Sequence, residues 1–100
     1  MFVQLIRCKV KPDAWGRAEE QLRRWQREQA PIAPGFKGEF LLREKGSPDG
    51  CIMVALFENE ELARQNSDRP ETNEYYREFL SFIEGEPEFI DAEAIHHYLL

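Results

Sequence analysis

Hydrophobic and polar residues recur along this chain in two periods, one typical of strands and one typical of helices. In residues 2–10 apolar side chains alternate with Arg7 and Lys9, which predicts a first strand. In residues 14–25 the apolar positions lie three or four apart, which predicts a core-facing helix capped by Asp13. The apolar stripe of that helix consists of Ala14, Trp15, Ala18, Leu22 and Trp25.

A second strand is predicted over residues 36–43, after two prolines between residues 30 and 35 have ended the helix. Its polar face is typical of an edge strand. Alternation places Phe36, Phe40 and Leu42 on one face, and Lys37, Glu39 and Arg43 on the other. The turn residues of positions 46–50 predict a hairpin into the next strand.

Residues 51–57 form an unbroken apolar run, which predicts a strand with both faces covered. Ile52, Val54 and Leu56 leave one side of that strand, and Met53, Ala55 and Phe57 leave the other.

A second helix begins after Asn59, which is expected to cap it, and the segment from Ser67 to Pro70 interrupts it. Pro70 is expected in the first turn of the restarted helix, which carries Tyr75 and Tyr76. Residues 85–87 predict a stop and a turn, and residues 89–98 predict the final strand.

The predicted order is βαββαβ in one domain over residues 1–100, an α+β chain. Right-handed crossovers joined by a hairpin favour a ferredoxin-like fold, a four-stranded antiparallel sheet with two helices on one face. The face away from the helices would then expose three or four apolar side chains of residues 51–57, with neighbours from residues 2–5, a patch that normally marks an interface. We therefore expect a homodimer that packs through the sheet face into a dimeric α/β barrel.

Composition narrows the classes of partner. The net charge of -6 disfavours nucleic acid, and no apolar run has the length of a membrane span. The first residues do not resemble a signal peptide, so a cytoplasmic location is expected. The first and third strands are expected to be parallel, which separates Cys8 from Cys51 and predicts free thiols.

Several of these features together resemble a known family. They are the element order, the length near 100 residues, the step Pro34-Gly-Phe36 into the second strand, and the run through Phe57-Glu-Asn59 into an acidic-capped helix. They resemble the antibiotic biosynthesis monooxygenase (ABM) domain of the dimeric α/β-barrel superfamily, over nearly the whole chain. The resemblance implies a pocket between sheet and helices. Its enzymes include cofactor-independent oxygenases of quinol-like or polyketide aromatics, and haem-degrading enzymes.

The residues that this family uses are only partly present. Haem-degrading relatives carry a histidine on the second helix and an asparagine on the first strand, and residues 60–83 and 2–10 lack them. The resemblance therefore implies no haem and no other cofactor. Oxygenase relatives use an asparagine, a tryptophan and a tyrosine on the second helix. This chain offers Asn59 or Asn66 and Tyr75 or Tyr76, without a tryptophan there.

Four residues are the candidates for a site. Trp25, Asn66 and Tyr76 are expected to bind a substrate, although Trp25 is also explained by core packing and Asn66 by ending a helix segment. His96 is the candidate catalytic base, or a core histidine on the face of Ile90. Its neighbour His97 is expected on the opposite face of the strand.

Three functions remain open. The first is a cofactor-independent monooxygenase acting on a small aromatic or quinol-like substrate. The second is a non-catalytic ligand-binding or stress-response module with the same pocket, and the third is a structural dimer whose pocket is filled by side chains. No phosphate-binding glycine loop, Cys-x-x-Cys or His-Glu-x-x-His motif supports another chemistry.

Overall fold

The computed structural model describes residues 1–100 and contains four strands and three helices. Strand β2 has the predicted bounds, and the second helix is divided as predicted. The elements are β1 (Phe2–Val10), α1 (Trp15–Glu28), β2 (Phe36–Arg43), β3 (Gly50–Phe57), α2 (Glu60–Ser67), α3 (Pro70–Leu80) and β4 (Ile83–Glu93).

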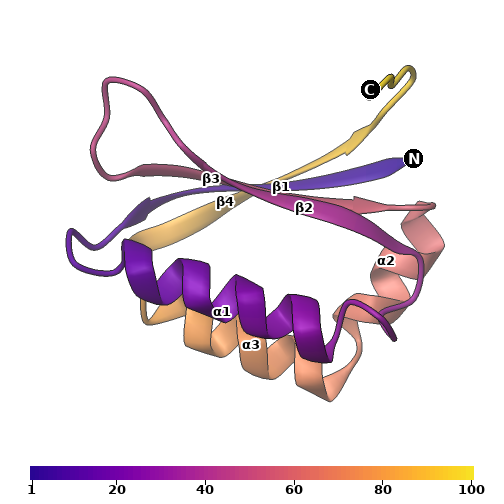
Figure 1. Ribbon diagram of the computed structural model, residues 1–100, viewed down its shortest axis with the longest axis horizontal. Coiled ribbons are helices and arrows are strands. Elements are labelled where there is room, and N and C mark those ends of the chain that lie inside the picture. Colours follow the sequence, from indigo (N-terminus) through magenta and orange to yellow (C-terminus); the bar gives the residue numbers. More distant parts are fainter.

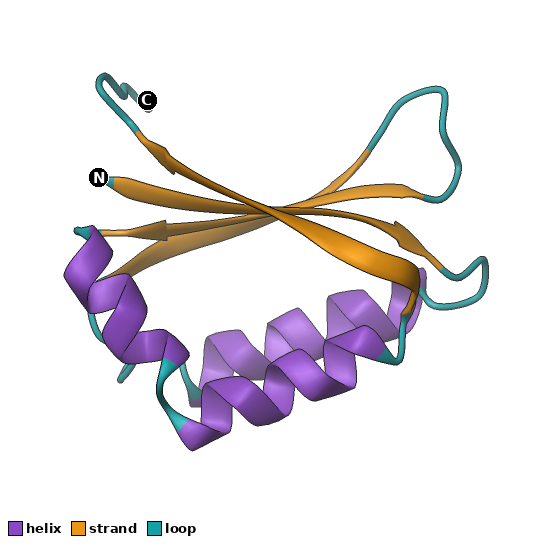
Figure 2. Cartoon of the chain, turned by 180° about the vertical axis from the view of Figure 1, so that it is seen from behind, coloured by secondary structure: helices purple, strands orange, loops and turns teal.

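The strands form one sheet in the order β2-β3-β1-β4, and all three pairings are antiparallel. The helices lie on one face of this sheet, where α1 and α3 run side by side, and the other face is uncovered (Figures 1 and 2). This arrangement confirms the ferredoxin-like prediction. None of the three helices combines the length and the apolar character that crossing a bilayer requires.

The starts of the helices follow local capping rules, with one exception. The side chain of Asn59 accepts a hydrogen bond from the Leu62 amide at 2.9 Å, and Pro70 opens α3, both as predicted. Asp13, however, does not cap α1. The residue at that position is Ala14, because a turn from Lys11 to Ala14 brings the chain into the helix one residue later.

The pairing of β1 with β3 is antiparallel, which corrects the expected parallel arrangement. Cys8 therefore lies directly opposite Cys51, and both thiols are buried and free. The amide of Val10 donates to the carbonyl of Asp49 at 2.8 Å, which makes these two residues a hydrogen-bonded pair. Such pairs alternate along β1 and β3, so Cys8 and Cys51, two residues further on, are also a hydrogen-bonded pair. Such pairs hold their Cβ atoms wider apart than a disulfide bond allows.

The last strand begins at Ile83, six residues earlier than predicted, and ends at Glu93. The segment Gly85-Glu-Pro87 belongs to the strand and is not a turn. An edge strand tolerates a proline because one row of its backbone amides needs no partner, and β4 is an edge strand beside β1. The residues that follow, including His96 and His97, belong to no strand.

Strand β2 contains an irregularity that reverses its predicted faces. Phe36 pairs with Phe57 and Gly38 with Leu56, so Lys37 is an extra residue, a β-bulge. Beyond the bulge, Glu39 pairs with Ala55 on the helix-facing side. Phe40 and Leu42, 48% and 42% exposed, lie on the open face.

Two regions share the space between sheet and helices. The buried core occupies the end where α1 begins and α3 ends, and it consists of Cys8, Val10, Ala14, Ala18, Cys51, Phe79, Phe82 and Ile83. Gly35 helps to shape the other end. It has a φ of 65°, and a Cβ atom there would lie 2.7 Å from the Leu62 side chain, so only glycine lets α2 pack against this turn.

Candidate functional site

A cavity of about 280 Å³ lies between the sheet and the helices, at the end away from the core. Every strand and every helix contributes to its wall, and 11 of its 18 lining residues are hydrophobic. This cavity contradicts the hypothesis of a filled structural core. The lining residues are Gln4, Ile6, Gln21, Leu22, Trp25, Phe36, Glu39, Met53, Ala55, Phe57, Asn66, Ser67, Thr72, Asn73, Tyr75, Tyr76, Phe79 and Phe89.

Aromatic rings form much of this wall. The Trp25 ring meets the rings of Phe36 and Tyr75 edge to face, with centroids 5.9 and 5.3 Å apart. The rings of Tyr76 and Phe89 lie 5.8 Å apart, which brings α3 and β4 together. Rings held in this way offer flat apolar surfaces that suit an aromatic guest.

Asn66 is the buried polar group of the cavity wall, with 5% of its surface exposed. Its Oδ1 accepts hydrogen bonds from Arg69 Nη1 at 3.3 Å and from the Thr72 hydroxyl at 3.1 Å. A guanidinium can only donate, so the amide oxygen must face Arg69. Both of these bonds end on Oδ1, and no group of the chain accepts a hydrogen bond from the amide NH₂ group.

The break between α2 and α3 makes this arrangement. Arg69, at the break, also donates to the Gln29 side chain at 2.6 Å, and its guanidinium lies 3.6 Å from Glu71. Arg69 therefore connects the end of α1 to the break, and it fixes the orientation of the Asn66 side chain through the hydrogen bond to Oδ1. The interruption predicted at residues 67–70 places a polar group in an apolar wall.

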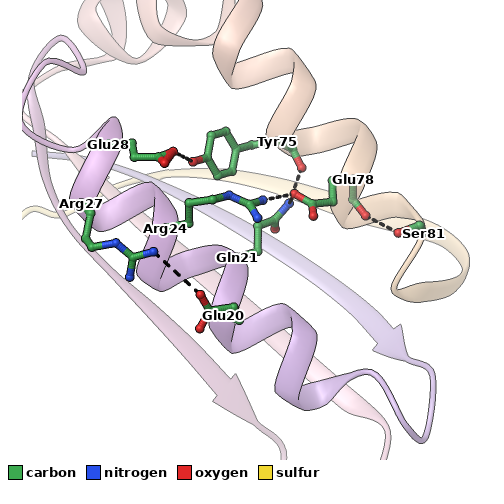
Figure 3. A network of polar contacts seen from close by, with 8 residues as sticks. All are labelled: Glu20, Gln21, Arg24, Arg27, Glu28, Tyr75, Glu78 and Ser81. Atoms are coloured by element: carbon green, nitrogen blue, oxygen red, sulfur yellow. Dashed lines mark hydrogen bonds and ion pairs between the residues drawn. The ribbon is translucent and has the colours of Figure 1, made fainter.

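A polar network between α1 and α3 supports the wall from the outside (Figure 3). The buried Gln21 amide donates to the Tyr75 carbonyl at 2.7 Å and to Glu78 at 3.0 Å. The Tyr75 hydroxyl points away from the cavity and donates to Glu28 at 3.1 Å, while Arg24 lies over the Tyr75 ring and pairs with Glu78. Burial raises the pKa of Tyr75.

The three predicted binding residues, Trp25, Asn66 and Tyr76, all line this one cavity, although the sequence placed them on three separate helical segments. Of the two tyrosines that the sequence offered, Tyr75 and Tyr76, both line the cavity, and the Tyr75 hydroxyl is hydrogen-bonded to Glu28. His96 is exposed, lies beyond the end of β4 and is absent from the cavity wall. The structure therefore does not bring the predicted base to the predicted binding residues.

Sequence reasoning missed Glu39, which lines the cavity from β2. Strict alternation put it on the solvent face, and the bulge at Lys37 turns it inward. Burial raises its pKa to about 7, and no neighbouring charge or hydrogen bond contributes to that rise. The sequence does hold a signal for the bulge, because a glycine inside a strand, here Gly38, often marks one.

A second hollow, of about 420 Å³, lies beside the N-terminus. Its eight lining residues include four acids, Glu58, Glu60, Asp91 and Glu93, and only three hydrophobic residues. The apolar cavity is therefore the better candidate for a small organic ligand.

Solved structures resemble this fold over nearly its whole length. The cofactor-independent oxygenase SnoaB from Streptomyces nogalater matches with a TM-score of 0.77 at 17% identity, over 96% of this chain and 94% of its own. A protein from Caulobacter crescentus, provisionally named an antibiotic biosynthesis monooxygenase, matches with a TM-score of 0.81 at 14% identity, over 95% and 90%. The chain has the ABM fold.

At these identities the likeness concerns the ABM fold and not the activity. A protein of unknown function from Nitrosomonas europaea has the same fold, with a TM-score of 0.75 at 14% identity over 99% of this chain and 93% of its own. No protein-family model and no curated protein matches the sequence.

Proposed function

We propose that this protein is a cofactor-independent monooxygenase that oxidises a small aromatic, quinol-like molecule bound in the apolar cavity. The observation that carries the proposal is the placement of the Asn66 amide group in a wall of aromatic rings. An aromatic ligand would pack against the rings of Trp25 and Tyr76, and the Tyr76 hydroxyl would form a hydrogen bond with one of its oxygen substituents. Its oxygen substituent would accept a hydrogen bond from the Asn66 NH₂ group, which is most favourable when that oxygen becomes negatively charged.

In the proposed reaction, an activated carbon of the substrate loses a proton and gives its electron pair to dioxygen. A C–O bond forms, the peroxide takes up a proton, and loss of water leaves a carbonyl group. The substrate supplies all the electrons, so the sum of the reaction is a CH₂ group plus O₂ giving C=O plus water. Asn66 would stabilise the enolate or phenolate before oxygen adds.

The alternative is a ligand-binding module with the same cavity and no turnover. Oxygen uptake with a series of hydroquinones and anthrones distinguishes the two, because each compound can also be tested for binding by calorimetry. Uptake above the rate without protein supports the oxygenase. Binding of these compounds without uptake supports the alternative, and absence of both contradicts each of them.

A matched pair of variants connects any activity to the cavity. Tyr76→Phe removes only a hydroxyl from the wall, and Tyr98→Phe makes the same change at a residue that is 74% exposed. We expect the first to reduce kcat/KM by about tenfold, as one lost hydrogen bond to the reacting molecule would, and the second to leave it unchanged.

The proposal includes a homodimer formed through the open face of the sheet. That face carries Val54 and Leu56 at its centre and the exposed Phe40, Leu42 and Ile90 towards its edges. Burying these side chains against a second copy removes apolar surface from water. The two free thiols agree with the reducing cytoplasm as the proposed location.

A further inference from the structure

We infer that Glu39 is the proton acceptor of the cavity, an inference that rests on the proposed function. Strand alternation had assigned Glu39 to the polar face of β2. The extra residue Lys37 shifts the register of β2, so Phe36 and Glu39 both face the helices, although they are three residues apart in the strand. Bulges often direct a side chain into a site in this way.

The cavity contains no other charged side chain. Strand β1 contributes Gln4 and Ile6, β3 contributes Met53, Ala55 and Phe57, and β4 contributes Phe89. Helices α1 and α2 face it with neutral residues, and α3 adds the titratable groups Tyr75 and Tyr76. The carboxylate of Glu39 therefore has no cation to pair with, and burial alone sets its acidity, with a pKa of about 7.

A carboxylate of this acidity suits general base catalysis at neutral pH. An ordinary glutamate holds a proton too weakly to remove one from a phenol or an activated CH group, whereas a base with a pKa near the working pH is both ionised and effective. An isolated acid that has no structural partner, directed into an apolar cavity, carries a cost to folding that a catalytic role would explain.

The geometry also separates the roles around a ligand. Glu39 stands on the sheet, while Asn66 and Tyr76 stand on the helices that cover it. A planar molecule between these layers would meet a proton acceptor on one side and the Asn66 donor on the other. In the proposed step a C–H or O–H bond of the substrate breaks, its proton moves to a Glu39 carboxylate oxygen, and the electron pair stays on the substrate until dioxygen takes it up. Glu39 then returns the proton to the peroxide.

The first test is the rate of oxygen uptake by Glu39→Gln, which keeps the size of the side chain and removes the base. We expect kcat/KM to fall by about 100-fold or more. The wild-type profile should rise as pH increases through about 7, and this rise should be absent from whatever activity the variant retains. Glu86→Gln, an exposed change on β4, is the matched control and should keep both rate and profile.

A second measurement does not depend on turnover. Calorimetry with 2-naphthol and with its methyl ether compares a ligand that can donate a proton to Glu39 with one that cannot. In the wild type we expect the affinity for 2-naphthol to increase several-fold as pH rises through about 7, because the carboxylate accepts a stronger hydrogen bond than the carboxylic acid. The methyl ether should show no such increase, and neither ligand should show it with Glu39→Gln.

These outcomes separate the inference from the proposed function. A wild type that takes up no oxygen but binds 2-naphthol in this pH-dependent way overturns the oxygenase and supports Glu39 as the acceptor. A wild type that turns over as fast as Glu39→Gln overturns the role of Glu39 and keeps the oxygenase. Loss of uptake in His96→Ala together with full activity in Glu39→Gln would assign the base to His96 instead.

Discussion

Arg69 donates a hydrogen bond to the Oδ1 atom of Asn66 at 3.3 Å, and this contact engages the oxygen of the buried amide and leaves its NH₂ group free. Thr72 donates to the same oxygen from the first turn of α3. Both donors require an acceptor, so the oxygen of the amide faces Arg69 and Thr72, and the NH₂ group lies on the other side. An NH₂ group can donate only to an atom with lone pairs, such as a ligand oxygen.

The first prediction concerns this amide. Asn66→Asp keeps an acceptor towards Arg69 and places a second acceptor where the NH₂ group was, so it should repel a ligand oxygen. We expect the affinity for a hydroquinone to fall by about tenfold to a hundredfold, measured by calorimetry, with little change in the midpoint of urea unfolding. Asn73→Asp, an exposed residue at the cavity rim, provides the comparison. Equal losses of affinity in both variants would contradict the assigned role of the Asn66 amide.

The second prediction follows from the burial of Glu39. Its pKa is raised from 4.5 to about 7, so the folded state binds more protons than the unfolded state between these values. The contribution of Glu39 to the free energy of unfolding is fully present below about pH 4.5, and it is lost as pH rises through about 7. The free energy of unfolding of Glu39→Gln minus that of the wild type should therefore be larger at pH 8 than at pH 4. We expect an increase on the order of 1 to 2 kcal/mol after allowance for solvent screening.

Urea unfolding at a series of pH values measures this difference. The exposed control Glu86→Gln should show the same difference from the wild type at every pH. A difference between Glu39→Gln and the wild type that does not change with pH would mean that the carboxyl group is hydrated in the folded protein.

Sequence patterns located three residues of the cavity wall but not its one acid, Glu39, and the reason lies in the strand register. Trp25 and Tyr76 follow from helical spacing, and Asn66 from the break before Pro70; each of these signals is local. Glu39 depends on one extra residue in β2, and such a shift moves every later side chain to the other face. No local periodicity records it.

Two further corrections are of the same kind. The opposition of Cys8 and Cys51 follows from the direction of β1 relative to β3, which is a property of the whole sheet. The position of His96 depends on where β4 begins, and Pro87 is compatible with either a turn or an edge strand until the neighbouring strand is known. Long-range pairing determined all three outcomes.

The third prediction tests the dimer. Leu42→Glu places a charge on the open face of the sheet, and Ile32→Glu makes the same kind of change in the exposed loop before β2. In sedimentation equilibrium at micromolar concentration we expect the wild type and Ile32→Glu at twice the chain mass of 11.8 kDa. Leu42→Glu should weaken the association constant by about tenfold or more, because a carboxylate would be buried without a partner. A monomeric wild type would contradict the interface.

The last prediction concerns Gln21, which joins α1 to α3 behind the cavity. Gln21 is 4% exposed, and its side-chain amide donates both to the Tyr75 carbonyl and to Glu78 (Figure 3). Gln21→Ala leaves the Tyr75 carbonyl without this donor and removes packing between the two helices, so we expect a loss of about 1 to 3 kcal/mol in the free energy of unfolding. Gln26→Ala, an exposed change in the same helix, should lie within about 0.5 kcal/mol of the wild type in urea unfolding. A Gln21→Ala variant as stable as the wild type would contradict this role of the Gln21 amide. Water would then replace the amide at the Tyr75 carbonyl, and the ring contact with Trp25 would fix the position of Tyr75.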